Sequence, residues 1–183
     1  MKIERLEEKV ALPDGVTATY DTAARALAVN GPKGELKRVI FHPALSVTVE
    51  GDTLIFVAKD ATLREKKLLY TARAHAKNLI RGVTEGYTYT LKVCSGHFPM
   101  TVASKNGVFE IKNFLGEKVP RTLKLKEGAD VTIEGDKVIV TGIDKEIVGQ
   151  VAADIEQLSK RPGFDSRIFQ DGIFIINKAG KQI

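Results

Sequence analysis

The sequence has a single cysteine, no tryptophan and no long hydrophobic run among its 183 residues. One cysteine, Cys94, cannot form a disulfide within the chain, and this predicts a protein of a reducing, cytoplasmic compartment. No apolar stretch approaches the roughly 18 residues that cross a bilayer, and the N-terminal segment MKIERLEEKVAL is too charged for a secretory signal. We therefore expect no association with a membrane.

The sequence also lacks the motifs of common catalytic sites. Residues 31–34, GPKG, place a lysine between glycines but lack the GxxxxGK[ST] frame, so they predict a hairpin turn rather than a nucleotide site. Cys94 and His97 are three residues apart, but a metal site needs two further ligands and a thiol–imidazole pair needs an orienting group. A half-buried cysteine at a strand end and a histidine in a loop is the simpler interpretation. We expect no cofactor, no metal, no small-molecule substrate and no enzymatic activity.

What the sequence does contain is an internal repeat. Residues 46–60, SVTVEGDTLIFVAKD, align without gaps with residues 130–144, DVTIEGDKVIVTGID, at an offset of 84, and seven of the fifteen positions are identical. The repeat predicts two copies of one small domain, residues 1–84 and 85–183, joined between Arg81 and Ser95. A copy of about 90 residues lies within the usual domain size and can bury a modest core.

The hydrophobic pattern of each half changes from a period of two to a helical period. Alternation predicts strands at 16–20, 26–29 and 36–41, and each repeated segment predicts a hairpin around its Gly-Asp pair. After a helix, a last strand is expected to close each copy, at 87–93 and at 173–176. The fold class we expect is α+β: two tandem duplicated domains, each an antiparallel sheet with one helix packed on one face.

Stripes of apolar residues at helical spacing predict helices over residues 61–81 and 144–160. Asp60 and Asp144 are the expected N-caps, because a short acceptor side chain can bond a free backbone N–H of the first turn. Gly82 is expected to end the first helix, and the Pro-Gly pair that follows the second stripe is expected to end the second.

The chain is weakly basic, with a formal net charge of +5 and an isoelectric point of about 9.2. An excess of this size is a mild indication of nucleic-acid binding. Cations gather in residues 105–126 and 157–183, and residues 178–183 are expected to form a loose basic tail. Long cationic side chains near loop ends suit contact with phosphates, although a solvated surface explains any single lysine more simply.

Several motifs together resemble one known family. They are GPKG at 31–34, GHFPMTV at 96–102, NFLGEKVPR at 113–121, GQVAADIEQ at 149–157 and RIFQDGIFIINK at 167–178. In these segments, and over nearly the whole chain, the sequence resembles the sixth large-subunit ribosomal protein family in its archaeal–eukaryotic branch.

The resemblance implies a non-catalytic, structural rRNA-binding protein of the large ribosomal subunit. It further implies that the second domain makes the main rRNA contact, near the sarcin–ricin loop and the translation-factor site. Large-subunit rRNA and neighbouring ribosomal proteins are the implied partners, and the cytoplasmic ribosome is the implied location. The alternative is a protein–protein interaction module within a ribonucleoprotein assembly, in which the first copy has kept the fold and meets a neighbouring protein.

The resemblance also implies which residues face the RNA. The NFLGEKVPR motif and the C-terminal signature provide Lys112, Asn113, Lys118, Arg121, Arg167, Gln170, Asp171, Gly172 and Lys178. Charge alone adds Lys160, Arg161 and Lys181. We expect no metal ligands.

Each class of residue has an expected role. Arg121 and Arg167 can hold phosphate oxygens with a planar guanidinium, and the lysines act as point charges. Gly172 either admits RNA close to its backbone or forms a local Asp-Gly turn. Phe169 is expected in the core, with stacking on an unpaired base as the alternative. Replacing both arginines by alanine is expected to weaken RNA binding with little change in melting temperature.

Overall fold

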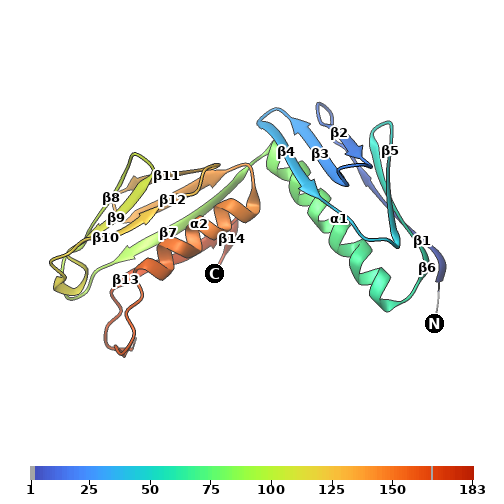
Figure 1. The fold of residues 1–183 in the computed structure, drawn as a ribbon. Coiled ribbons are helices and arrows are strands. Elements are labelled where there is room, and N and C mark those ends of the chain that lie inside the picture. The colour runs from blue at the N-terminus through green and yellow to red at the C-terminus, as the bar shows by residue number, and fades with distance from the viewer. Residues whose placement is uncertain (1–2, 166) are drawn as a thin grey trace. The chain divides into compact units, whose positions relative to one another are not determined.

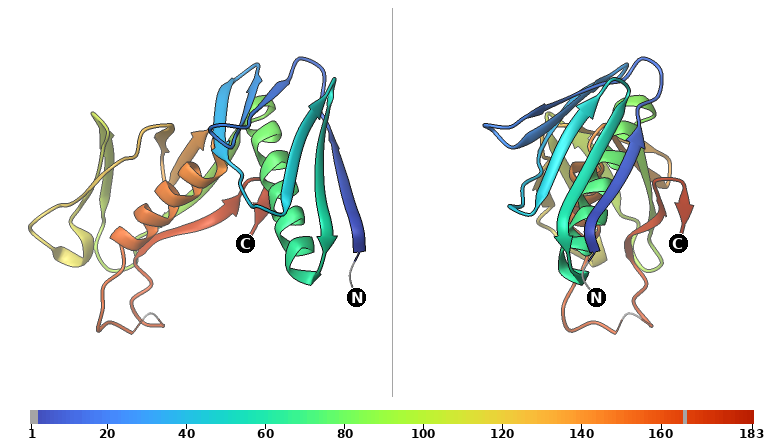
Figure 2. Two further views of the ribbon diagram at one scale, coloured as in Figure 1. Left: turned by 45° about the vertical axis from the view of Figure 1, so that its right-hand side comes forward. Right: turned by 90° about the vertical axis from the view of Figure 1, so that its right-hand side faces the viewer.

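The computed structural model describes residues 3–165 and 167–183, and the chain divides into two compact units, Met1–Gly86 and Tyr87–Ile183. Each unit combines antiparallel sheets with one helix, which confirms the expected α+β fold class (Figure 1 and Figure 2). The strands of each unit divide into two sheets rather than one. Among the described residues, no helix is long and apolar enough to cross a membrane.

The first unit contains β1 (Ile3–Ala11), β2 (Thr17–Asp21), β3 (Ala26–Gly31), β4 (Gly34–Val39), β5 (Leu45–Glu50), β6 (Thr53–Ala61) and α1 (Leu63–Thr84). One sheet has the strand order β2-β3-β4, and the other has the order β1-β6-β5. α1 packs on strands of both sheets, and the core between them includes Leu27, Phe56 and Leu69, each fully buried. Burying side chains of this size contributes roughly 1.5–3 kcal/mol each.

The first helix begins with a capping box. The Thr62 hydroxyl accepts from the Arg64 N–H at 3.3 Å, and the Glu65 carboxylate accepts from the Thr62 N–H at 3.0 Å. The expected cap, Asp60, instead lies in β6 with a left-handed backbone, φ 50°. That prediction was wrong because it assigned the cap by alignment with Asp144 of the second half. Thr62 and Glu65 together satisfy more of the free N–H groups than Asp60 alone could.

The first helix also ends later than expected. It continues through Gly82, which is buried, as far as Thr84. The left-handed turn that stops it is at Gly86, φ 76°, whose N–H donates to the Arg81 carbonyl at 3.2 Å. Glycine marks the end of a helix where this geometry is needed, and Gly82 does not have it.

The second unit contains β7 (Tyr87–Cys94), β8 (Thr101–Lys105), β9 (Val108–Lys112), the 3-10 helix η1 (Phe114–Gly116), β10 (Arg121–Lys124), β11 (Ala129–Glu134), β12 (Lys137–Gly142), α2 (Lys145–Leu158), β13 (Gly172–Lys178) and β14 (Lys181–Gln182). Strands β10-β9-β8 form a small sheet, and the larger sheet has the order β11-β12-β7-β13-β14. α2 packs along the larger sheet, and the core between them includes Ile155 of the helix and Leu91 and Ile173 of the sheet, which are fully buried.

Strand β7 does not close the first copy, as the sequence predicted, but runs through the middle of the second unit's larger sheet. Its counterpart in the first unit is β1. Leu91 pairs with Val138, and Val10 pairs with Leu54, which is the repeat counterpart of Val138. The prediction failed because the charges of β1, IERLEEKVA, hid a strand ahead of the first hairpin, so the first strand of the second copy was assigned to the first.

Helix α2 has the cap that the sequence predicted. Asp144 Oδ1 accepts from the Glu146 N–H at 2.8 Å. The helix ends at Leu158, with Ser159 as C-cap, before the Pro-Gly pair is reached. The pair therefore belongs to the connection that follows the helix.

The C-terminal residues form a hairpin and not a loose tail. β14 pairs with β13, so that Lys178 lies opposite Lys181. Ala179 and Gly180 make the turn with left-handed φ of 52° and 88°. The Ile183 N–H donates to the Ile176 carbonyl at 3.1 Å, which fixes the end of the hairpin.

Candidate RNA interface

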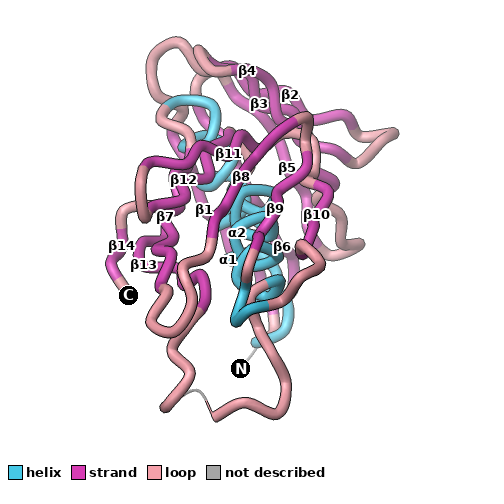
Figure 3. The backbone as a smooth tube through the Cα atoms, turned by 90° about the vertical axis from the view of Figure 1, so that its left-hand side faces the viewer, coloured by secondary structure: helices cyan, strands magenta, loops and turns pink. Residues whose placement is uncertain are grey.

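Two loops of the second unit carry most of the predicted RNA contacts. One follows β9 and contains η1 (residues 113–120). The other connects α2 to β13 (residues 159–171) and has neither helix nor strand in its described part (Figure 3). The two loops meet at the C-terminal end of α2, because Arg121 reaches across to the end of that helix. The structure thus brings most of the predicted residues to one end of the unit.

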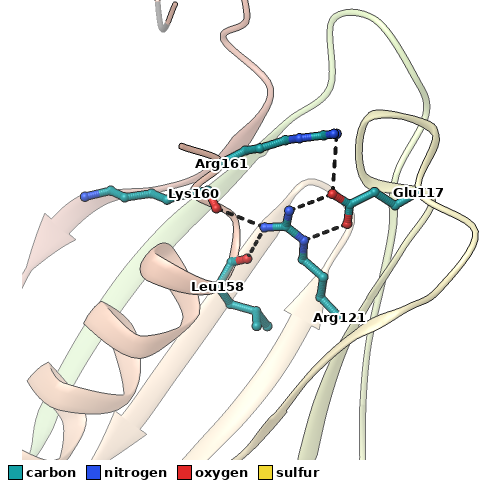
Figure 4. A network of polar contacts seen from close by, with 5 residues as sticks. All are labelled: Glu117, Arg121, Leu158, Lys160 and Arg161. Carbon is teal, nitrogen blue, oxygen red and sulfur yellow. Dashed lines mark hydrogen bonds and ion pairs between the residues drawn. The ribbon is translucent and has the colours of Figure 1, made fainter. Parts of the chain in front are cut away.

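Arg121 fastens the two loops together (Figure 4). Its guanidinium donates twice to the Glu117 carboxylate, each time at 2.7 Å, and donates to the carbonyls of Leu158 and Lys160 at 2.7 and 3.0 Å. The guanidinium carbon also lies 4.4 Å from the centre of the Phe114 ring. We call this arrangement the Arg121 clasp. Four of its five N–H donors bond within the protein and its side chain is only 21% exposed, so Arg121 has a structural role here, and the expected phosphate contact stays a prediction.

The clasp has a clear physical basis. The last carbonyls of a helix have no partner within the helix, and the helix dipole places negative charge there, so a guanidinium satisfies both. Hydrogen bonds from Arg121 lower the pKa of Glu117 despite partial desolvation, and the charges of Arg121 and Arg161 lower it further. Arg161 lies 3.4 Å from Glu117 and 4.4 Å from the centre of the Phe164 ring.

The exposed cations of the two loops and of the end of β9 are Lys112, Lys118, Lys160, Arg161 and Arg167. Lys112 lies 3.3 Å from Glu110. Arg167 is 88% exposed, and its guanidinium donates to both Asp165 oxygens at 3.1 and 2.8 Å. These hydrogen bonds lower the pKa of Asp165. Exposed ion pairs of this kind are weak, so both cations can exchange their partners for phosphate oxygens.

Two uncharged predicted residues shape the loops. Asn113 has a left-handed backbone, φ 58°, and its side-chain amide donates to the Pro99 carbonyl at 3.0 Å. The Gln170 amide is exposed and lies 3.4 Å from the Arg167 carbonyl. Asn113 therefore turns the chain into η1, whereas Gln170 keeps its side chain at the surface.

Asp171 anchors its loop to the segment that follows β7. Its side chain is 2% exposed, and its carboxylate accepts from the backbone N–H groups of Gly96 and His97 and lies 2.5 Å from His97 Nδ1. Burial alone raises the pKa of Asp171, but the hydrogen bonds from His97 and Gly96 outweigh it, and the pKa is lowered. Cys94 ends β7 half-buried and His97 lies in the loop that follows, as the simpler interpretation of that pair predicted. In the part of the chain that the structure describes, no group of three or more metal-ligating side chains occurs.

Gly172 does not form the local Asp-Gly turn that was one of its two expected roles. It is buried at the start of β13, opposite Cys94. A Cβ at this position would lie 3.0 Å from the Phe174 ring and 3.4 Å from Ser159 Oγ. Ser159 Oγ accepts from the Ile173 N–H at 2.9 Å, so the glycine lets the helix end approach the start of β13.

Aromatic side chains line a pocket beside the clasp. Phe169 is half-buried rather than in the core, with its ring 5.0 Å from His97 and 4.8 Å from Phe164 between centroids. The pocket has a volume of about 450 Å³ and is also lined by Phe114, Phe174 and Arg161. Glu117, Phe164 and Phe174 were missed: Glu117 and Phe174 lie inside the family motifs, but neither charge nor periodicity marked any of the three as part of the site.

Lys178 and Lys181 are not part of this cluster. Both are exposed at the hairpin turn, opposite the end of β13 that holds Gly172. Gly172 pairs with Cys94 at the end of β7, whereas Lys178 pairs with Tyr89 near its beginning. The predicted residues therefore form one large group and one separate lysine pair.

Comparison with known proteins identifies the family of this chain. The family model of Ribosomal protein L6 matches residues 12–86 and 100–172. Large ribosomal subunit protein uL6 of Methanospirillum hungatei is 38% identical over 179 residues, which cover 98% of this chain and 99% of that protein. The protein of the same name from Methanobrevibacter smithii is 39% identical over 173 residues, covering 94% and 96%. The chain therefore belongs to the ribosomal protein L6 family.

Proposed function

We propose that this protein is a structural rRNA-binding component of the large ribosomal subunit and that it holds rRNA with one end of its second unit. Membership of the family makes it a ribosomal structural protein and not an enzyme. Its relatives are named as proteins of the large subunit. One observation carries this assignment: exposed cations lie on the two loops that the Arg121 clasp joins.

Within this surface, Lys118, Lys160, Arg161 and Arg167 contact phosphates, with Lys112 at its margin. Arg121, Asp171 and Gly172 act indirectly, since they fix the two loops from which these cations project. Neutralising phosphates supplies affinity without reading sequence, so recognition follows the shape of the folded RNA.

The site on the subunit lies near the sarcin–ricin loop and the translation-factor site, with neighbouring ribosomal proteins as further partners. The resemblance of the NFLGEKVPR and RIFQDGIFIINK segments supports this placement. The aromatic pocket gives the surface a second mode of contact, because Phe164 and Phe169 offer ring faces on which an unpaired base can stack.

Salt dependence tests the proposal. The full-length protein is titrated with an rRNA fragment that contains the sarcin–ricin loop, over a range of potassium chloride concentrations. Four phosphate contacts predict that log K falls with log salt at a slope of about 3. Binding that is flat across salt concentration, or equally tight for an unrelated RNA hairpin, contradicts the proposal.

The residues are tested by paired substitutions. Lys118→Ala with Arg167→Ala lowers the salt slope by about 1.5 and weakens every rRNA fragment uniformly. Lys37→Ala, on exposed β4 of the first unit, is the matched control and leaves the slope unchanged. Lys178→Ala with Lys181→Ala reports whether the hairpin makes a separate contact: it lowers the slope independently of the first pair. If neither double substitution changes the salt slope, the assignment of these residues to the RNA-binding surface is wrong.

A further inference from the structure

Strand β1 has a free edge. It is the outermost strand of the sheet β1-β6-β5, and no other described strand pairs with it. The Leu12 N–H donates to the Asp52 carbonyl at 2.8 Å, which extends the ladder towards β6. Because backbone groups alternate along an antiparallel strand, the N–H and C=O groups of Glu7, Lys9 and Ala11 point away from β6. An unpaired row of this kind is a template for another strand.

The second unit shows what fits such an edge. β7, the counterpart of β1, has strands on both sides, since Leu91 pairs with Val138 on one side and with Ile175 of β13 on the other. The Val93 N–H donates to the Asp136 carbonyl at 2.7 Å, which repeats the bond from Leu12 to Asp52 in the first unit. The place that β13 takes beside β7 is therefore open beside β1.

A groove lies where the missing strand belongs. It has a volume of about 640 Å³ and runs between the end of β1 and the last turns of α1. Its lining residues include Val10, Ile80, Lys9, Lys77, Arg81 and Glu85. In the second unit the corresponding strand, β13, lies beside β7 and contacts α2: the Ile175 N–H donates to Glu156 Oε1 at 3.0 Å.

The lining of the groove indicates the chemistry of the occupant. At the end of α2, Glu156 and the C-cap Ser159 accept hydrogen bonds from the backbone of β13. At the end of α1, the cations Lys77 and Arg81 line the groove instead. Three cations line the groove, against the one carboxylate of Glu85, which pairs with Arg81 at 2.8 Å. A strand that binds here needs apolar side chains alternating with acidic ones.

We propose that the free edge of β1 is a docking site for an extended, acidic segment of a partner protein, which adds to the sheet as an antiparallel strand in the place that β13 takes in the second unit. Main-chain hydrogen bonds to Glu7, Lys9 and Ala11 supply the pairing. The apolar side chains of the segment enter the groove, and its carboxylates meet Lys77 and Arg81. The surface is separate from the proposed RNA interface and takes a different class of partner.

A synthetic peptide is the first probe. It has about seven residues, valine and isoleucine alternating with glutamate, and blocked ends. Added to the full-length protein, it slows backbone amide exchange of Lys9 and Ala11 by about tenfold or more, while Glu8 and Val10, which already face β6, do not change. A peptide with lysine in place of glutamate binds about tenfold more weakly. Absence of the alternating protection overturns the proposal.

Substitutions at one position separate backbone from side-chain effects. Lys9→Pro removes an N–H from the free edge without touching the ladder to β6, and it lowers peptide affinity by about tenfold. Lys9→Ala keeps the N–H and lowers affinity by about threefold or less. If Lys9→Pro does not fold, the exchange pattern of the unmodified protein decides. Equal affinity of all three proteins counts against strand addition.

Two other occupants are outcomes of the same measurements. An rRNA fragment that protects Lys9 and Ala11, or displaces the peptide, assigns the groove to RNA and overturns the proposal. Protection that grows with protein concentration in the absence of peptide assigns the edge to a second copy of the chain, with the same consequence. If the proposal holds, Lys77→Glu weakens binding of the acidic peptide but not of the lysine peptide, whereas Lys37→Glu, outside the groove, weakens neither.

Discussion

Two arginines of the second unit show how surroundings decide what one residue type does. Arg121 is mostly buried and donates to Glu117 and to two carbonyls at the end of α2. Arg167 is exposed and has one neighbouring carboxylate, Asp165. Without Arg121, a partly buried carboxylate and two carbonyls would lose their hydrogen bonds, which lowers stability. Without Arg167, the exposed Asp165 would bond water instead, with little effect on stability. We therefore expect one arginine to serve stability and the other to serve binding.

Arg121→Ala should lower the free energy of unfolding by about 2–3 kcal/mol, because it leaves Glu117 and the carbonyls of α2 without their partner. Urea unfolding followed by far-UV circular dichroism measures the change. Arg167→Ala is the control and should stay within about 0.5 kcal/mol of the unmodified protein. Equal stability of the two variants would show that the clasp is not a structural element.

Asp171 should make stability depend on pH in the acid range. Its folded pKa lies below the ordinary value of an aspartate, so its stabilising contribution is complete above that ordinary value and is lost as pH falls through the lower folded pKa. Asp171→Asn removes a group that binds a proton more readily when unfolded. The difference in unfolding free energy between the two proteins should therefore shrink from about pH 5 to about pH 2. A difference that stays constant over this range contradicts the assignment.

At the scale of elements, the repeat preserves pairing register but not the set of strands. β1 and β7 occupy equivalent positions, and only β7 acquires a second neighbour, β13. The hairpins and the cap at Asp144 could be predicted, because alternation and a short acceptor before an apolar stripe are local signals. Strand β1 could not, because a strand at a sheet edge carries charges that mask its alternation.

A glycine joins three elements where β12 ends. A Cβ at Gly142 would lie 2.6 Å from the Gly128 carbonyl and 2.7 Å from Val148 Cγ2. Gly142→Ala should therefore destabilise the protein by about 2–4 kcal/mol, because a backbone carbonyl cannot move aside. Thermal unfolding measures the loss.

Gly149→Ala is the matched control. The added Cβ would lie 3.5 Å from the Tyr89 hydroxyl, an ordinary contact, and the position is inside α2. Alanine is the better helix former, so this variant should be as stable as the unmodified protein or more stable by up to about 1 kcal/mol. Similar losses for both variants would mean that side-chain volume at Gly142 is not what matters.

At the scale of the whole molecule, each unit has its own hydrophobic core. We expect residues 87–183 to fold alone and to bind the rRNA fragment within about threefold of the full chain, because the exposed cations of the interface all lie within them. Circular dichroism and the same titration measure both properties. A folded fragment with no affinity would place essential contacts in the first unit.

Charge and motifs predicted part of the interface, and contacts that form only in the folded chain account for the rest. Charge and family motifs indicated the two loops and the exposed cations Lys118, Lys160 and Arg167. They could not separate a cation that faces solvent from one that ties the fold together, because Arg121 and Arg167 look alike in sequence. The internal contacts of Asp171 and Gly172 could not be predicted for the same reason: their partners, His97 and Phe174, are recognisable only once the strands are paired.

The connection from α2 to β13 is anchored at both of its ends. At one end Arg121 binds the carbonyls of Leu158 and Lys160, and at the other Asp171 binds the backbone of His97. Residues inserted or deleted between these anchors disturb neither of them. During evolution the loop is therefore free to change length to suit a differently shaped ribosome, while the two anchors hold its base in place.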